Sequence, residues 1–169
     1  MPDDVIPIRP IGIIRTAHHA ALGTPIQPRA AAGHVGTVEL EAEWADGLLD
    51  LAGFERIWLL YWFNRAAGPL TRVVPYRDTC EHGIFATRMP PRPVRIGMSA
   101  VRLVAVRGAI LDVAEIDVLD GTPLLDIKPY VPDYDSWPGV RTGWLEGPDV
   151  PRSHLRADGR YQREPLAAT

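Results

Sequence analysis

Apolar and polar residues alternate over several short stretches of the chain, which is the pattern of β-strands that bury one face. Residues 38–44 carry apolar side chains at every second position, with glutamates between them. Residues 99–106 alternate in the same way, whereas residues 56–64 form a continuous apolar run that indicates a strand buried on both faces. The pattern predicts further strands at 8–15, 83–87, 109–119 and 124–127.

The sequence between these stretches favours turns and leaves room for little helix. Asp46 can cap a short helix that runs to Leu51. Three prolines in residues 89–97 exclude helix and central strand there. The 15 glycines and 17 prolines exceed the usual share of roughly 12% of a chain, so turns are frequent. We therefore expect a mainly β fold, a small barrel or sandwich with hardly any helix, and no Rossmann domain.

The chain length of 169 residues suits one domain, which we place at residues 8–150 between an N-terminal tail (1–7) and a polar C-terminal tail (151–169). The N-terminus has neither the basic nor the apolar region of a signal peptide, and the longest apolar run is too short to span a membrane. Cys80 is the only cysteine, which excludes an internal disulfide and favours a reducing compartment. We expect a cytoplasmic protein with no membrane partner.

Charge is spread unevenly along the sequence, although the formal net charge is only −3. Residues 65–107 hold eight arginines against Asp78 and Glu81, while residues 108–150 are strongly acidic. The total excludes a strongly basic protein, but it leaves a local basic surface open. The five histidines show no metal-binding spacing, so we expect no metal site.

Three arginines lie on the proline-rich stretch, at positions 88, 92 and 95. Because the prolines stiffen the backbone, these side chains would be ordered at low entropic cost, as a clamp for a carboxylate or phosphate requires. Surface arginines that pair with the acidic segment are the alternative. The residue types alone do not separate the two.

Asp126, Lys128 and Tyr130 follow one another at alternate positions after a Gly-containing turn. In an extended segment they would project from one face, where a carboxylate, an amine and a phenol can do acid–base work. A salt bridge beside a packed tyrosine is the simpler alternative. Lys128 is the only lysine of the chain, which draws attention to this segment.

Two long strings make the sequence similar to a known family: GIFATRMPPRPVRIGMS at 83–99 and DVLDGTPLLDIKPY at 117–130. With IGIIR at 11–15, PIQP at 25–28 and residues 47–63, they resemble the TsaA-like family, also called YaeB-like or TrmO, over about residues 8–135. The resemblance implies a single-sheeted antiparallel β-barrel with one or two short helices, unlike Rossmann methyltransferases. It also implies a homodimer that binds S-adenosylmethionine and methylates N6 of threonylcarbamoyladenosine at position 37 of tRNA.

The same resemblance implies roles for individual residues. The cofactor would be bound by the PIQ segment, the residues after the aromatic run, the FATR arginine, a methionine and the DGTP turn: Pro25, Ile26, Gln27, Asn64, Arg65, Arg88, Met98, Asp120, Gly121, Thr122 and Pro123. Catalysis would fall to Asp126, Lys128 and Tyr130, with Asp126 or a neutral Lys128 accepting the N6 proton. Arg92 and Arg95 would bind the substrate.

The chain departs from the family pattern in the arginine-rich loop. Val94 and Arg95 stand where relatives have asparagine and proline, so an amide is lost and a charge is added. Longer bacterial members also carry a further C-terminal domain, which these 169 residues do not include. Two alternatives therefore stay open beside the tRNA methyltransferase: a small-molecule methyltransferase on the same fold, and a module that binds S-adenosylmethionine without catalysis.

Overall fold

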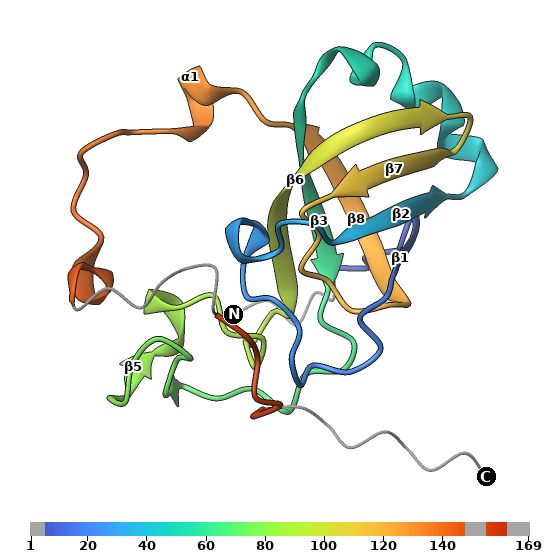
Figure 1. Cartoon of the computed structure of the whole chain (residues 1–169). Helices are drawn as coiled ribbons and strands as arrows, with labels where there is room; N and C mark the ends of the chain where they lie inside the picture. The colour runs from blue at the N-terminus through green and yellow to red at the C-terminus, as the bar shows by residue number, and fades with distance from the viewer. Residues whose placement is uncertain (1–5, 148–154, 162–169) are drawn as a thin grey trace, which may run out of the picture.

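A computed structural model describes residues 6–147 and 155–161, and its main feature is a closed barrel of antiparallel strands. The barrel order is β1-β2-β7-β6-β3-β8, and every neighbouring pair is antiparallel. Figure 1 shows the barrel with long loops beneath it and a separate arm at its side. The barrel strands are β1 (Gly12–Thr16), β2 (Val35–Leu40), β3 (Arg56–Trp62), β6 (Ile96–Arg107), β7 (Ile110–Ala114) and β8 (Thr122–Pro129). The expected single-sheeted, mainly β fold is confirmed.

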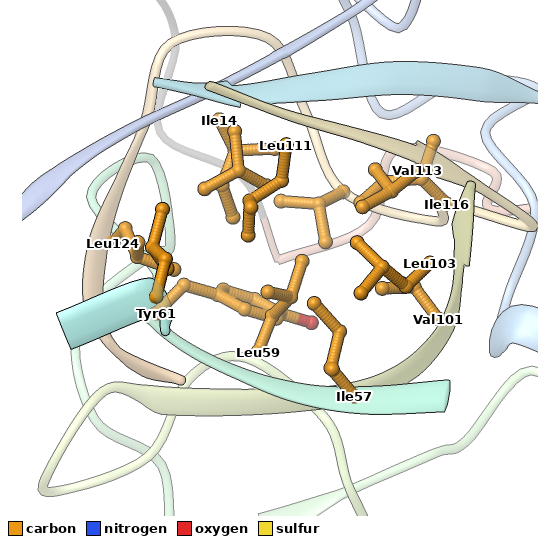
Figure 2. Packing of buried hydrophobic residues seen from close by; sticks show 13 residues of the cluster. Ile14, Ile57, Leu59, Tyr61, Val101, Leu103, Leu111, Val113, Ile116 and Leu124 are labelled. Carbon is orange, nitrogen blue, oxygen red and sulfur yellow. The ribbon is translucent and has the colours of Figure 1, made fainter. Parts of the chain in front are cut away.

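Inward-facing aliphatic side chains from all six strands fill the barrel. Every second residue of β3 and β6 points inward, so Ile57, Leu59 and Val101 are inaccessible to solvent. They pack with residues of the other strands in one continuous core (Figure 2). The outward side chains of β3, such as Trp58, are half-buried rather than buried. The expectation of a strand buried on both faces is therefore wrong, because loops cover its outer face only in part.

Two expected strands end early for identifiable reasons. β2 stops at Leu40 because its partner β7 begins only at Ile110, and residues Ala42–Leu48 form a 3-10 helix, η2. The predicted strand therefore ends at Leu40 rather than at residue 44. The predicted short helix also begins earlier than expected, at Ala42 instead of after Asp46. β7 ends at Ala114 because Glu115 has a φ of 59°, so the backbone leaves the sheet there. The pairing of β6 with β7 is irregular, because the register shifts between Leu103 and Ala105.

Gly97 has a packing role at the end of the barrel. A Cβ added there would lie 2.3 Å from the Tyr61 ring, so only glycine lets the ring cross β6. Tyr61 is thereby held with its edge toward Phe63 and its hydroxyl 3.0 Å from Ser99 Oγ. The glycine of the RIGMS string therefore positions a tyrosine hydroxyl inside the molecule.

The segments outside the barrel are short elements and loops. β4 (Arg72–Val73) and β5 (His82–Gly83) form a small second sheet, and η4 (Ile84–Ala86) follows it. Residues 130–147 form the arm, which contains α1 (Pro132–Asp135) and η5 (Gly143–Glu146) and leads away from β8 (Figure 1). The remaining short helices are η1 (Pro28–Ala30) and η3 (Leu51–Gly53).

Residues 155–161, which the sequence predicts as part of a tail, lie against the loops beneath the barrel. Backbone hydrogen bonds join Ala157 to Gly23 and Thr24, and Leu155 accepts one from Ile26. Tyr161 packs on a small buried cluster that includes Val73. Of the expected tails and domain end, residues 1–5, 148–154 and 162–169 lie outside the described residues.

Candidate cofactor and substrate site

The loops and one side of the barrel enclose a cavity of about 970 Å³. Its wall combines segments that are far apart in sequence: the β1–β2 loop, the residues after β3, the loop before β6, the turn before β8, the arm and residues 155–161. It also reaches the outer faces of β3 and β6 at Trp58 and Ala100. A cavity of this size lies at the upper end of the range of roughly 300–1,000 Å³ for small-molecule sites.

The PIQ segment forms one wall, and its backbone is held in an unusual conformation. Gln27 has a φ of 70°, a left-handed value that is uncommon for a residue with a side chain. Its side-chain oxygen accepts a hydrogen bond of 3.0 Å from Arg88 Nη1. Pro25 lies in a bridge with Arg156, so the segment is fixed from behind. The structure therefore brings the PIQ segment and the FATR arginine together.

The loop that carries Arg88 is braced from within. Arg92 Nη1 donates to the carbonyl oxygens of Ile84 (3.1 Å) and Thr87 (2.8 Å), so its guanidinium spans the loop. The Thr87 hydroxyl also donates to Ile84. Arg92 and Arg95 do not line the cavity, whereas the exposed side chain of Phe85 does. In this chain Arg92 is a support of the loop, and its expected contact with substrate stays a prediction.

The DGTP turn is attached to the residues that follow β3. Arg65 donates to the carbonyl oxygens of His19 (2.9 Å) and Asp120 (2.8 Å), and the backbone of Gly121 takes a φ of 75° beside it. Thr122 anchors the turn through a hydrogen bond of 2.7 Å to Leu119. Asn64, Arg65 and Thr122 line the cavity, but Asp120, Gly121 and Pro123 lie behind that lining. Met98 also lies away from the cavity, on the outer face of β6.

Asp126 and Lys128 share the outer face of β8 and form an ion pair of 2.8 Å. Neither lines the cavity, and both side chains are largely exposed. Asp126 holds the pKa of Lys128 above its usual value, so the amine is protonated at neutral pH. Lys128 therefore does not supply a neutral amine in this structure. Tyr130 does line the cavity, with its ring 5.6 Å from that of Trp58.

A partly buried carboxylate in the cavity wall escaped the sequence analysis. Asp117 accepts a short hydrogen bond of 2.6 Å from Ser99 Oγ, which also contacts the Tyr61 hydroxyl. The Gln27 backbone N–H contributes a further hydrogen bond. Burial nevertheless raises the pKa of Asp117 to about 6, because desolvation outweighs these donors. The sequence feature that could have indicated it is that Asp117 stands between two apolar residues, Ile116 and Val118, which are both buried.

The cavity wall is rich in arginine, and half of its arginines come from the basic stretch at residues 65–107. Among the described residues that line it, six are arginines: Arg29, Arg56, Arg65, Arg77, Arg88 and Arg160. Asp117 and Asp135 are the acidic residues of the same lining. Within residues 6–147 and 155–161 no group of three or more His, Cys, Asp or Glu side chains is arranged to bind a metal. In the same ranges no helix is long and apolar enough to cross a membrane.

The closed barrel and its loop-built cavity define a small non-Rossmann ligand-binding domain that presents arginines and one partly buried carboxylate to its ligand. Residues 13–136 match the tRNA-methyltransferase O N-terminal domain, so the chain belongs to that family.

Three comparisons illustrate the relationship. A probable S-adenosyl-L-methionine-binding protein of Pyrococcus abyssi is 48% identical over 153 residues, which cover 90% of this chain and 83% of that protein. The mouse tRNA (adenine(37)-N6)-methyltransferase is 35% identical over 135 residues, or 75% of this chain and 31% of that enzyme. A crystal structure of TrmO from Pseudomonas aeruginosa superposes with a TM-score of 0.72 at 37% identity and covers 86% of this chain and 63% of that one. This chain thus spans less than two thirds of the solved chain.

Proposed function

We propose that this protein is an S-adenosylmethionine-dependent methyltransferase that acts on N6 of an adenosine at position 37 of tRNA, in its threonylcarbamoyl form. The observation that carries the proposal is that a member of this family brings the PIQ segment, Asn64, Arg65, Arg88 and Thr122 to the wall of one cavity. Relatives that bind S-adenosylmethionine or methylate tRNA share the matched region.

The residues of the cavity fit S-adenosylmethionine. Arginine guanidinium groups suit its carboxylate, the apolar side chains of Phe63 and Leu119 suit its adenine ring, and Asp117 offers an anion to its cationic sulfur. When bound, S-adenosylmethionine would supply its methyl group to an in-line nucleophile, with the neutral thioether as the leaving group. Catalysis by the protein then consists mainly of orientation. Arg88 and Arg65 are fixed by hydrogen bonds to Gln27 and to the DGTP turn, so they hold the ligand in one position.

The chain's own residues divide the remaining work. A base must accept the N6 proton. Because Lys128 is protonated, Asp126 is the base among the two candidates, Asp126 and Lys128. Lys128 is then suited to an anionic group of the substrate, such as a phosphate or the threonyl carboxylate. Tyr130 lines the cavity two positions further on and is placed to orient the adenine. Met98, Asp120, Gly121 and Pro123 support the cofactor wall in this proposal, and Arg95 meets the tRNA.

We include a homodimer in the proposal. The outer face of β6 exposes Ile96, Met98 and Val104, with the exposed Arg102 between the last two, and the arm exposes Tyr134 and Trp137. A second copy of the chain would cover these apolar side chains. It would also approach the β8 face that carries Asp126 and Lys128, because β3 alone separates β8 from β6 in the sheet. Sedimentation of the purified protein tests this part, and a monomer at micromolar concentration would contradict it.

The experiment that tests the function is mass spectrometry of tRNA nucleosides from a strain that lacks the gene. We expect threonylcarbamoyladenosine without its N6-methyl group, and restoration of the methyl group by the wild-type gene. The single cysteine and the proposed tRNA substrate support a cytoplasmic location as part of this proposal. Unchanged nucleosides would contradict the tRNA assignment.

A binding module without catalysis is the second candidate. It is favoured by the Pyrococcus abyssi relative, which matches over most of its length and is named for binding alone. Purified protein that binds S-adenosylmethionine but transfers no methyl group to tRNA from the deletion strain would support it. Methyl transfer to a small molecule instead of tRNA would support the third candidate, a small-molecule methyltransferase. The sequence feature that favours it is Arg95, which stands where relatives have proline.

A further inference from the structure

Asp117, whose carboxylate faces the cationic sulfur in the proposed function, has surroundings that can discriminate between charged and neutral ligands. It lies in the cavity wall just before β8, and the neighbouring residues Ile116 and Val118 are buried in the barrel core. Ser99 Oγ donates to its carboxylate at 2.6 Å, and the Gln27 backbone N–H donates as well. A carboxylate has about four acceptor positions, so capacity remains for a ligand.

The charges around Asp117 make it the compensating anion of the cavity. The other acidic residue of the described lining, Asp135, lies exposed in α1, whereas six arginines line the same space. Two of the six are ion-paired outside this lining, Arg56 with Glu115 and Arg160 with Asp158. The groups packed around the Asp117 carboxylate are Ser99 of β6, Tyr61 of β3, Gln27 of the β1–β2 loop and Arg88 of the loop before β6. Arg88 is the cation among them. The position beside the Asp117 carboxylate is therefore the most favourable one in this wall for a cationic group of a ligand.

We propose that Asp117 selects the charge of the methyl donor: its carboxylate favours the cationic sulfonium of S-adenosylmethionine over the neutral thioether of S-adenosylhomocysteine. This inference rests on the proposed function, because it needs the donor to occupy the cavity. Charge selection would favour binding of the donor and release of the product. The donor enters with a positive charge that Asp117 stabilises, and the product leaves after that charge has moved away with the methyl group.

Isothermal titration calorimetry with both ligands separates charge selection from a merely structural role. We expect Asp117→Asn to weaken S-adenosylmethionine binding by roughly 10- to 100-fold at pH 7.5, the range for a hydrogen-bonded charge. Binding of S-adenosylhomocysteine should change less than about twofold, since its sulfur is uncharged. The matched control is Asp112→Asn in β7, because Asp112 pairs with Arg107 and does not line the cavity. Equal losses for both ligands, or no loss for either, would overturn the inference.

The pH dependence of the same two affinities provides a readout that needs no variant of Asp117. The pKa of Asp117 is about 6, so we expect the preference of the wild type for S-adenosylmethionine to shrink as the pH falls from 7.5 to 5. No histidine lines the described part of the cavity to confuse the result. Ser99→Ala removes a donor that lowers the pKa of Asp117, so the transition should move to higher pH.

Each outcome of these titrations either supports or overturns charge selection by Asp117. A wild-type preference that is constant between pH 5 and 7.5 overturns charge selection even if Asp117→Asn does not fold. A wild type that binds both ligands, with a preference that follows the pH, supports it. A wild type that binds neither ligand overturns the proposed function and this inference together, whereas equal losses in Asp117→Asn leave the proposed function standing.

Discussion

The interior of the barrel and the wall of the cavity are built in opposite ways, although Tyr61 belongs to both. The barrel interior is aliphatic, and its side chains reach it through regular alternation along the strands. The cavity wall is rich in arginine and comes from loops whose backbones are fixed by single hydrogen bonds and left-handed residues such as Gln27. Strand pairing and packing thus stabilise the first region, whereas individual polar contacts shape the second.

This difference predicts that barrel substitutions change stability and cavity substitutions change binding. The largest effect is expected for Leu59→Ala, which empties space at a fully buried position of β3. It should lower the free energy of unfolding by about 2–5 kcal/mol in urea titrations. Leu22→Ala is the matched control, because Leu22 is 73% exposed and should matter little. A loss below about 1 kcal/mol for Leu59→Ala would break the comparison.

Asp117 lies where the barrel core meets the cavity wall, and its raised pKa should make the stability of the protein depend on pH. Because the folded pKa of Asp117 is about 6 and the unfolded value is roughly 3.9, the folded protein holds a proton that the unfolded chain releases. The contribution is fully present below pH ~4 and is lost as the pH rises through 6. Relative to Asp117→Asn, the wild type should lose about 2–3 kcal/mol between pH 4 and pH 8. Unfolding in urea at both values measures this, and parallel behaviour of the two proteins would contradict it.

A cavity arginine should show the reverse behaviour. Arg88→Ala removes a guanidinium that is exposed in the free protein and bonded to Gln27, so stability should change by less than about 1 kcal/mol. Affinity for S-adenosylmethionine should fall roughly 10- to 100-fold, as for the loss of one charged hydrogen-bond donor. Arg15→Ala provides the control, since Arg15 pairs with Glu39 on β2 away from the cavity. Similar titration curves for the two variants would place the ligand elsewhere.

The smallest effect is expected at Lys128. Its ion pair with Asp126 is largely exposed, so Lys128→Ala should alter the free energy of unfolding by no more than about 0.5 kcal/mol. Because the amine lies outside the cavity, affinity for S-adenosylmethionine should stay within about twofold, while methylation of tRNA falls. Calorimetry and a methyl-transfer assay on the same preparation separate these effects. A large loss of cofactor affinity would move Lys128 into the cofactor site.

The sequence predicted the barrel better than the cavity, for a physical reason. Alternation reports directly on a two-sided strand, so β6 was recognisable, and β3 was recognisable as an apolar run of strand length. The strand expected at 83–87 is wrong, because residues Ile84–Ala86 form η4. The other errors lie where strand pairing stops. β2 ends for want of a partner beyond Ile110, and β7 ends at a glutamate with positive φ. The alternation of apolar and polar residues within a strand reports neither of these causes.

The cavity depends on contacts between distant segments, which no local pattern records. Family resemblance named the PIQ segment and Arg88, and the structure brings them together. It did not show that Arg92 turns inward to brace its own loop, nor that Asp117 lies in the wall. Residues 155–161 were also missed, because a short polar segment has no pattern that indicates what it packs against.

The attachment of residues 155–161 has a consequence for the order in which the molecule matures during synthesis. Every barrel strand lies before Pro129, so the barrel has all its strands before the ribosome reaches Leu155. The cavity gains its back wall only afterwards, when Leu155 and Ala157 pair with the β1–β2 loop. A chain that ends before Leu155 would therefore contain every barrel strand but lack this part of the cavity wall, and its affinity for the ligand should be lower.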